Sequence, residues 1–174
     1  AFQQGRRAAL PRGLPHLLPP VARQGPQGIG RGQRVQVLHV QLGAQGELAG
    51  KAQRVLAAGR SGGEVPVPGC ANRAVLLDAA YLGGTAAHGI EFDDGFRQGS
   101  VHPGCVVLPA ALAAAYAERA SGAALIEAVV AGYETVIAVG AAVHPDLRRR
   151  GFHPTGVVGV FGAAVSGLLA AFPR

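Results

Sequence analysis

The run from Gly122 to Val143 constrains the fold of this chain more than any other segment. Its side chains are apolar or small apart from Glu127, Tyr133, Glu134 and Thr135. The two glutamates are seven positions apart, so in a helix they lie on one face. A helix with so narrow a polar face needs neighbours that bury most of its other sides. The run therefore predicts a helical bundle.

Other segments have the apolar spacing of helices that could supply these neighbours. They are residues 74–88, 107–119 and 156–172. We expect Asp78 to face solvent and Pro109 to lie in a first turn, where proline is tolerated. Ser121 and Thr155 precede helical runs and are expected to be N-caps. With 49% hydrophobic and 15% charged residues in 174, the chain is predicted to be mainly α, with one helical domain.

Small residues mark places where these helices should approach closely. The pair Gly83 and Gly84 indicates either close approach of another backbone or a local break in its helix. The last helix carries Gly159, Gly162, Ala163, Ser166 and Gly167, small residues on a face that would pack tightly against another helix. Its apolar run is shorter than the roughly 20 residues that usually span a bilayer. We expect it to pack inside a protein, and we expect no membrane partner.

The composition changes near residue 69. Residues 1–69 contain nine Lys and Arg against two Asp and Glu, whereas residues 70–174 contain seven against eight. The first segment is rich in Gly, Pro, Gln and Arg, and a helical period emerges only in 35–58. We predict that 1–69 is an irregular basic segment, either disordered or translated in the wrong frame, and that 70–174 is the helical domain.

This distribution of charge argues against nucleic acid as a partner. The basic residues are concentrated in 1–69, where Phe2 is the only aromatic residue, so bases would have almost nothing to stack on. Cys70 and Cys105 form no C-x-x-C pair and fit buried side chains in a reduced compartment. No secretory leader is recognisable, and we expect a cytoplasmic protein. The absence of Met and the start at Ala1 are expected of a fragment.

Polar residues that could carry chemistry gather in loops between the predicted helices. These residues are His88, Glu91, Asp93, Asp94, His102 and His153. Carboxylates and imidazoles are the usual groups for moving protons near neutral pH, so an acid–base centre is one interpretation. Helix capping and loop hydrogen bonding are the alternative for Asp93 and Asp94.

The same histidines and aspartates could instead be ligands of zinc, iron or manganese. That set would comprise His88, Asp93, Asp94, His102 and His153. Their spacing matches none of the motifs His-x-x-x-His, His-Glu-x-x-His or paired cysteines. Phosphate-binding and dinucleotide-binding glycine motifs are also missing. We therefore predict no metal and no cofactor.

Four blocks in succession resemble one known family. They read AAYLGGTAAHGIEFDD, SVHPGCVVLPAALAAA, SGAALIEAVVAGYE and RRRGFHPTGVVGVFGAA. The order His-x-x-Glu-Phe-Asp-Asp, His-Pro-Gly, Gly-Tyr-Glu and Gly-Phe-His-x-Thr-Gly is similar to that of the N-terminal helical domain of the MmgE/PrpD family. The resemblance extends from about Ala74 to Ala171.

The resemblance implies a lyase or isomerase of small polycarboxylates. Members include 2-methylcitrate dehydratase, cis-aconitate decarboxylase and iminodisuccinate epimerase, none with an obligatory metal. It implies that Glu91, His102 and His153 line the active site. Supporting or substrate-binding roles then fall to His88, Asp93, Asp94, Arg150 and Thr155. The arginines 148–150 could equally form a solvated loop.

In such a family this domain pairs with a smaller α+β domain, which supplies lysines, and the intact protein is expected to be a homodimer. We therefore expect a dehydratase-type reaction on an acid such as 2-methylcitrate, with His102 or His153 handling a proton and Glu91 assisting. The 174 residues alone are expected to be poorly soluble and inactive. The alternative is a non-catalytic helical interaction protein with a basic tail.

Overall fold

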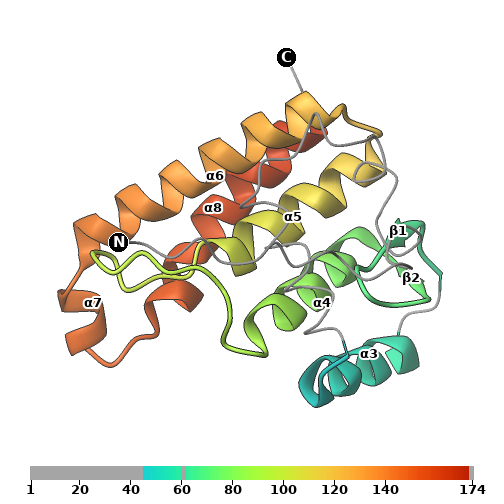
Figure 1. Ribbon diagram of the computed structural model, residues 1–174, viewed down its shortest axis with the longest axis horizontal. Helices are drawn as coiled ribbons and strands as arrows, with labels where there is room; N and C mark the ends of the chain where they lie inside the picture. Colours follow the sequence, from blue (N-terminus) through green and yellow to red (C-terminus); the bar gives the residue numbers. More distant parts are fainter. Residues whose placement is uncertain (1–44, 60–61, 173–174) are drawn as a thin grey trace, which may run out of the picture.

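The structure is a computed structural model that describes residues 45–59 and 62–172 (Figure 1). Within these ranges the chain is mainly helical, as predicted, with one small antiparallel sheet. The helices, labelled as in Figure 1, are α3 (Glu47–Gly59), α4 (Leu76–His88), α5 (Gly104–Ala117), α6 (Gly122–Val143), α7 (Asp146–Arg149) and α8 (Pro154–Ala171). The strands are β1 (Val65–Pro66) and β2 (Arg73–Ala74).

Helix α5 lies in the middle of the helical layers. α8 packs along both α5 and α6, α4 packs against α5, and α3 packs against α4 (Figure 1). The main core contains Val107 and Ala111 of α5, Ala128 and Val136 of α6, and Val158 of α8. These side chains are small or branched, so the helices approach closely and few large side chains are needed to fill the interior.

Glycines set the distance between α6 and α8, which confirms the predicted tight packing at Gly162 but not at Gly167, where an added Cβ would meet no atom within 4 Å. A Cβ atom on Gly162 would lie 2.1 Å from Val136 Cγ2 and 2.8 Å from the carbonyl oxygen of Gly132. A Cβ atom on Gly132 would lie 2.7 Å from Val107 Cγ1. The hydroxyl of Ser166, fully buried in the same region, donates to the carbonyl of Val107 at 3.3 Å. No larger side chain fits at either glycine.

The Gly83–Gly84 pair lets helix α5 approach α4 closely and does not break helix α4. Helix α4 continues through both residues. A Cβ atom on Gly84 would lie 2.9 Å from the carbonyl oxygen of Cys105, and one on Gly83 would lie 3.1 Å from Pro109 Cβ. The pair therefore lets α4 contact the backbone of α5 directly.

Two expectations about helix position were wrong. Helix α5 begins at Gly104 rather than near Val107, so Pro109 lies inside the helix and not in its first turn. Asp78 is 6% exposed instead of facing solvent, while Leu77 beside it is 71% exposed. The reason is that Ala79, Leu82 and Gly83 form the face of α4 that packs inward, and Asp78 falls on its edge.

Helix α6 has an open side, although its sequence predicted burial on most sides. Val130 is 53% exposed, and Glu127 and Glu134 are exposed as well. The N-cap prediction for this helix is confirmed, because the Ser121 side chain accepts a hydrogen bond from the backbone N–H of Ala124 at 3.1 Å. Neighbouring helices cover only part of its circumference, so the apolar residues outnumber the buried positions.

Helices α6 and α8 are both long and apolar enough, by length and composition, to cross a membrane, a property that core helices of water-soluble proteins share. α8 also exposes part of its apolar surface. The residues concerned are Val157, Val160, Phe161 and Leu168. Its opposite side packs on α5 and α6, so α8 is a core helix with one uncovered face.

The part of 1–69 that the structure describes is more regular than the composition indicated. α3 falls almost wholly within 35–58, where a helical period emerges, and Lys51 pairs with Glu47 at 2.6 Å. In the strand pair, Val65 lies opposite Ala74. Arg73 donates to the hydroxyl of Tyr116 on α5 at 2.6 Å, which ties the strands to the bundle. The prediction for 1–44 lies outside the described residues.

Candidate functional site

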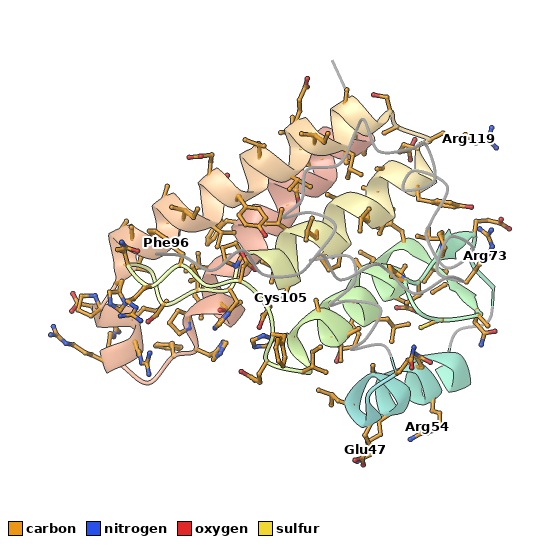
Figure 2. The ribbon with its side chains drawn as sticks, viewed as in Figure 1. Glu47, Arg54, Arg73, Phe96, Cys105 and Arg119 are labelled. Carbon is orange, nitrogen blue, oxygen red and sulfur yellow. The ribbon has the colours of Figure 1, made fainter. Side chains whose placement is uncertain are left out.

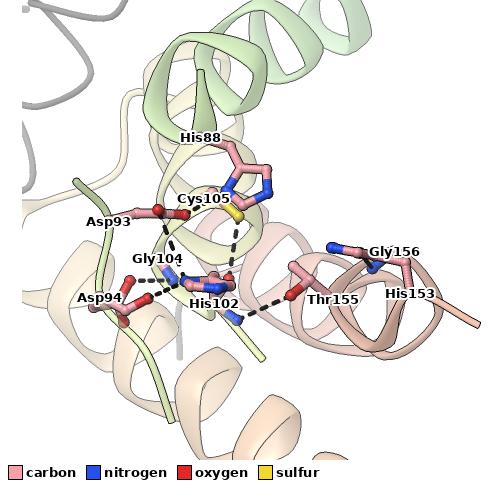
Figure 3. Close-up of polar contacts among 9 residues, drawn as sticks. All are labelled: His88, Asp93, Asp94, His102, Gly104, Cys105, His153, Thr155 and Gly156. Carbon is pink, nitrogen blue, oxygen red and sulfur yellow. Dashed lines mark hydrogen bonds and ion pairs between the residues drawn. The ribbon is translucent and has the colours of Figure 1, made fainter. Parts of the chain in front are cut away.

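Three helix ends meet at one place in the bundle, and each end carries a histidine (Figure 3). His88 is the last residue of α4, His102 comes just before α5, and His153 is the N-cap of α8. The ring centroids of His88 and His102 are 5.3 Å apart, and those of His88 and His153 are 6.1 Å apart. The fold thus brings together histidines that are up to 65 positions apart in the sequence.

Asp93 is the buried partner of His88. Its carboxylate is 3% exposed, and Oδ2 lies 2.6 Å from His88 Nδ1. The other oxygen, Oδ1, lies 3.7 Å from His102 Nδ1. An ionised carboxylate can only accept hydrogen bonds, so His88 Nδ1 is the donor in this pair. Asp93 therefore fixes the orientation of His88 and is more than a loop cap.

Asp94 holds the segment that carries His102. Its backbone carbonyl oxygen lies 2.7 Å from His102 Nδ1, and its Oδ1 accepts from the backbone N–H of Gly104 at 2.9 Å. The carboxylate thus caps the start of α5, the role that loop chemistry suggested. Because a carbonyl oxygen accepts only, His102 Nδ1 carries a proton, and Nε2 of the neutral ring has a free lone pair.

His153 has the opposite arrangement. Its Nδ1 accepts a hydrogen bond from the backbone N–H of Gly156 at 3.2 Å, so in the neutral ring the proton is on Nε2. The predicted N-cap, Thr155, was wrong. Thr155 lies in the first turn of α8 and is 4% exposed, and its Oγ1 accepts from the backbone N–H of His102 at 3.0 Å. Thr155 therefore joins α8 to the His102 segment.

A pocket of about 660 Å³ opens beside these histidines, between α4, α5 and α8, with Leu48 of α3 at its edge. Most of its lining is apolar or small. The polar and ionisable side chains in the lining are Tyr81, Thr85, His88, Glu91, Cys105, His153 and Thr155. Glu91 is exposed and has a φ of 55°, a left-handed conformation that is uncommon for a side chain of its size. His102 contacts the lining residue His88 and does not line the pocket itself.

A family model, the MmgE/PrpD N-terminal domain, matches residues 40–170. The chain belongs to the MmgE/PrpD family. The match begins 30 positions before the boundary predicted at Cys70, so it includes α3 and β1. A search among curated proteins finds no match for this chain. All four blocks that resemble the family fall inside the matched residues.

Cys105 is a residue of this MmgE/PrpD domain that the sequence interpretation passed over. It lies in the first turn of α5, lines the pocket, and its thiol donates to the carbonyl of His102 at 3.1 Å (Figures 2 and 3). Burial raises the pKa of this thiol to about 12, and the Asp93 and Asp94 carboxylates act in the same direction. The spacing His-Pro-Gly-Cys at a helix start could have pointed to it.

Tyr133 on α6 is a second residue near the site that the sequence interpretation did not single out. Burial raises the pKa of its hydroxyl above the usual range, and the Asp94 carboxylate raises it further. Tyr133 is therefore neutral throughout the physiological pH range and backs the Asp94 segment as an uncharged group. The block Gly-Tyr-Glu carried this tyrosine in the sequence, with no indication of the residue it would face.

The arginines after α6 lie apart from the pocket lining. Arg148 donates to the Ser100 hydroxyl at 3.3 Å, and Arg149 lies 3.5 Å from Asp146. Arg150, which was expected to support substrate binding, is exposed at the C-terminal end of α7. This arrangement favours the solvated-loop interpretation of 148–150.

Proposed function

We propose that this MmgE/PrpD domain supplies the acid–base side of a lyase centre for a small polycarboxylate such as 2-methylcitrate. The observation that carries the proposal is the opposite hydrogen bonding of two histidines. His102 donates through Nδ1 to a carbonyl, whereas His153 accepts through Nδ1 from a backbone N–H. The two neutral rings therefore offer a base and an acid at their Nε2 atoms.

A dehydration needs both groups. The base removes a carbon-bound proton next to a carboxylate, the C–H electrons form the double bond, and the hydroxyl leaves as water once the acid has protonated it. In our proposal His102 Nε2 takes the proton and His153 Nε2–H protonates the hydroxyl. Asp93 orients the imidazole of His88, whose ring neighbours those of His102 and His153. Glu91, which lines the pocket, assists a neighbouring imidazole.

The pocket also has a feature that suits an anionic substrate. Its lining includes Thr155 and Gly156, in the first turn of the 18-residue helix α8. A helix N-terminus carries a partial positive charge that attracts carboxylates. The remaining positive charge is expected from lysines of the family's second domain, and the intact protein is expected to be a homodimer.

One observation favours a second candidate, an interaction domain without catalysis. The uncovered face of α8, with Val160 at 61% exposure, and Leu77 on α4 would suit contact with another protein. Such a function would need no ordered histidines. Loss of binding after changes on α8, with no effect of changes at His102, would identify it.

The test is a pair of substitutions in the intact protein, His102→Asn and His153→Asn, with His144→Asn as the matched control outside the pocket. Each variant is incubated with the substrate acid in deuterated water. Deuterium incorporation measures exchange of the carbon-bound proton, and product formation measures elimination. We expect His102→Asn to lose both. His153→Asn should keep exchange and lose elimination, and His144→Asn should keep both. Unchanged elimination in the first two variants would refute the proposal.

A further inference from the structure

Three side chains with different donor atoms converge beside the pocket, and two of them, His88 and Cys105, line it. His88 comes from the end of α4, Asp93 from the following loop, and Cys105 from the first turn of α5 (Figure 3). One nitrogen, one carboxylate oxygen and the sulfur of this group all lie within 4.8 Å of one another. The sequence predicted no metal site, because the spacing of its histidines and aspartates matches no metal-binding motif, and Cys105 was not among the candidate ligands.

We propose that His88, Asp93 and Cys105 form a binding site for a divalent cation of the zinc type. Nitrogen, carboxylate oxygen and thiolate sulfur are the ligands that zinc takes in proteins. Three protein ligands leave a fourth position for water or another small ligand. His88 and Cys105 both line the pocket, which provides the entry path and the space for that fourth ligand.

The charges of the site fit a divalent cation. Asp93 contributes one negative charge, and Cys105 contributes a second when its thiol proton leaves for solvent on binding. Together they neutralise the ion in a region where the Asp93 side chain is 3% exposed. A neutral complex avoids most of the cost of burying a charge.

The distances require only small movements. Tetrahedral zinc with bonds of about 2.0–2.3 Å places its ligand atoms about 3.3–3.6 Å apart. His88 Nδ1 and Asp93 Oδ2 are now 2.6 Å apart and hydrogen-bonded, so the ion would replace that hydrogen bond and separate them. The sulfur lies within 4.8 Å of the other two ligand atoms, so it would move closer by at most about 1.5 Å. The His88 side chain is 33% exposed, which leaves it room to turn.

The neighbouring histidines are outer contacts of this site. His102 Nδ1 is engaged by the carbonyl of Asp94, and His153 Nδ1 by the N–H of Gly156. His102 Nδ1 also lies 3.7 Å from Asp93 Oδ1, the oxygen not paired with His88. Such second contacts orient carboxylate ligands in metal sites. The proposed ligand set is therefore limited to three side chains. It rests on their geometry and not on proton transfer by His102 and His153, and the bound ion would replace the His88–Asp93 hydrogen bond that the proposed function uses.

Cobalt(II) tests the site, because a cobalt–thiolate bond produces a charge-transfer absorption in the near ultraviolet. The reduced chain is titrated with Co²⁺ in anaerobic buffer without added thiols. We expect the band to saturate at one ion per chain and to disappear on addition of Zn²⁺, which binds such ligands more tightly. The Cys105→Ser chain should lack the band, and Asp93→Asn and His88→Ala should weaken Co²⁺ binding at least about tenfold.

Cys70→Ser is the matched control. Cys70 is the other cysteine of the chain; its sulfur accepts from Gln53 and is not one of the three converging ligand atoms, so its replacement should leave the band unchanged. Circular dichroism confirms that each variant is folded. X-ray absorption spectroscopy of the zinc-loaded, unsubstituted chain is a second test that needs no variant. We expect one sulfur ligand and otherwise only nitrogen or oxygen ligands around the zinc. No band, a band kept by Cys105→Ser, or a zinc shell without sulfur would overturn the proposal.

Discussion

The contact between α6 and α8 and the polar end where α4, α5 and α8 meet are built on different principles. Between α6 and α8, Gly132, Gly162 and Ser166 allow close packing, and the contact depends on shape. At the polar end, hydrogen bonds hold groups that shape alone would not position, such as the bond that the backbone N–H of His102 donates to Thr155 Oγ1. Helix α8 takes part in both. Its first turn contributes residues to the site, and its later turns pack the helix against α5 and α6. Substitutions in the two regions should therefore have separable effects.

The largest effect is expected at the polar end. His102→Asn should lower turnover by the intact protein about 10²–10⁴-fold, because a positioned base contributes a factor of that size. The free energy of unfolding should change little, since the side chain is 38% exposed. Steady-state kinetics and urea unfolding of the same preparation check both parts. A large loss of stability would mean that the two regions are not separable.

The helix contact should show the reverse behaviour. Gly162→Ala places a Cβ atom 2.1 Å from Val136 Cγ2 and should cost about 3 kcal/mol or more of folding free energy. Gly167→Ala on the same helix is the control, because no atom lies within 4 Å of its added Cβ. It should stabilise the chain by about 0.5–1 kcal/mol. Urea unfolding that gives equal effects for both variants would contradict the packing account.

Thr155 is the point at which the two regions meet. Thr155→Val removes the acceptor for the backbone N–H of His102 and should cost about 1–3 kcal/mol in stability. Turnover should fall as well, because the His102 segment loses its tie to α8. Thr155→Ser keeps a hydroxyl and should recover most of both losses. If valine and serine behave alike in unfolding and kinetics, this hydrogen bond does not position His102.

The last prediction concerns pH. The pKa of Cys105 is raised in the folded chain from its ordinary value of 9.0 to about 12, mainly by burial. The unfolded chain therefore ionises this thiol first as the pH rises, and stability should fall between about pH 9 and pH 12. With a chelator present, the free energy of unfolding should fall less over this pH range for Cys105→Ser than for the unsubstituted chain. An identical pH profile for the two chains would contradict the assigned burial.

The sequence predicted the helices better than their surroundings. Apolar spacing located α6 at its observed bounds, because a long helix contains many repeats of the pattern. The start of α5 was placed too late because Pro109 resembles a first-turn proline, whereas the capping by Asp94 from ten positions earlier sets the true start. Local residue patterns do not contain such contacts.

The candidate site was predicted as a set of residues and not as an arrangement. Loop position identified His88, Asp93, His102 and His153, which the fold brings together. The N-cap prediction for Thr155 was wrong because its partner is decided by tertiary contact, with 53 positions between Thr155 and His102. Cys105 is buried as predicted, but its position beside His88 and Asp93 was not predicted. The protons on the histidines likewise depend on backbone groups whose position the sequence does not reveal.

The central claim is that His102 and His153 carry their protons on opposite nitrogens. Long-range ¹H–¹⁵N correlation spectra of the histidine rings at alkaline pH report this directly, with His102→Asn and His153→Asn used for assignment. We predict the Nδ1–H tautomer for His102 and the Nε2–H tautomer for His153. The same tautomer at both rings, or the reverse assignment, would contradict the proposed division into base and acid.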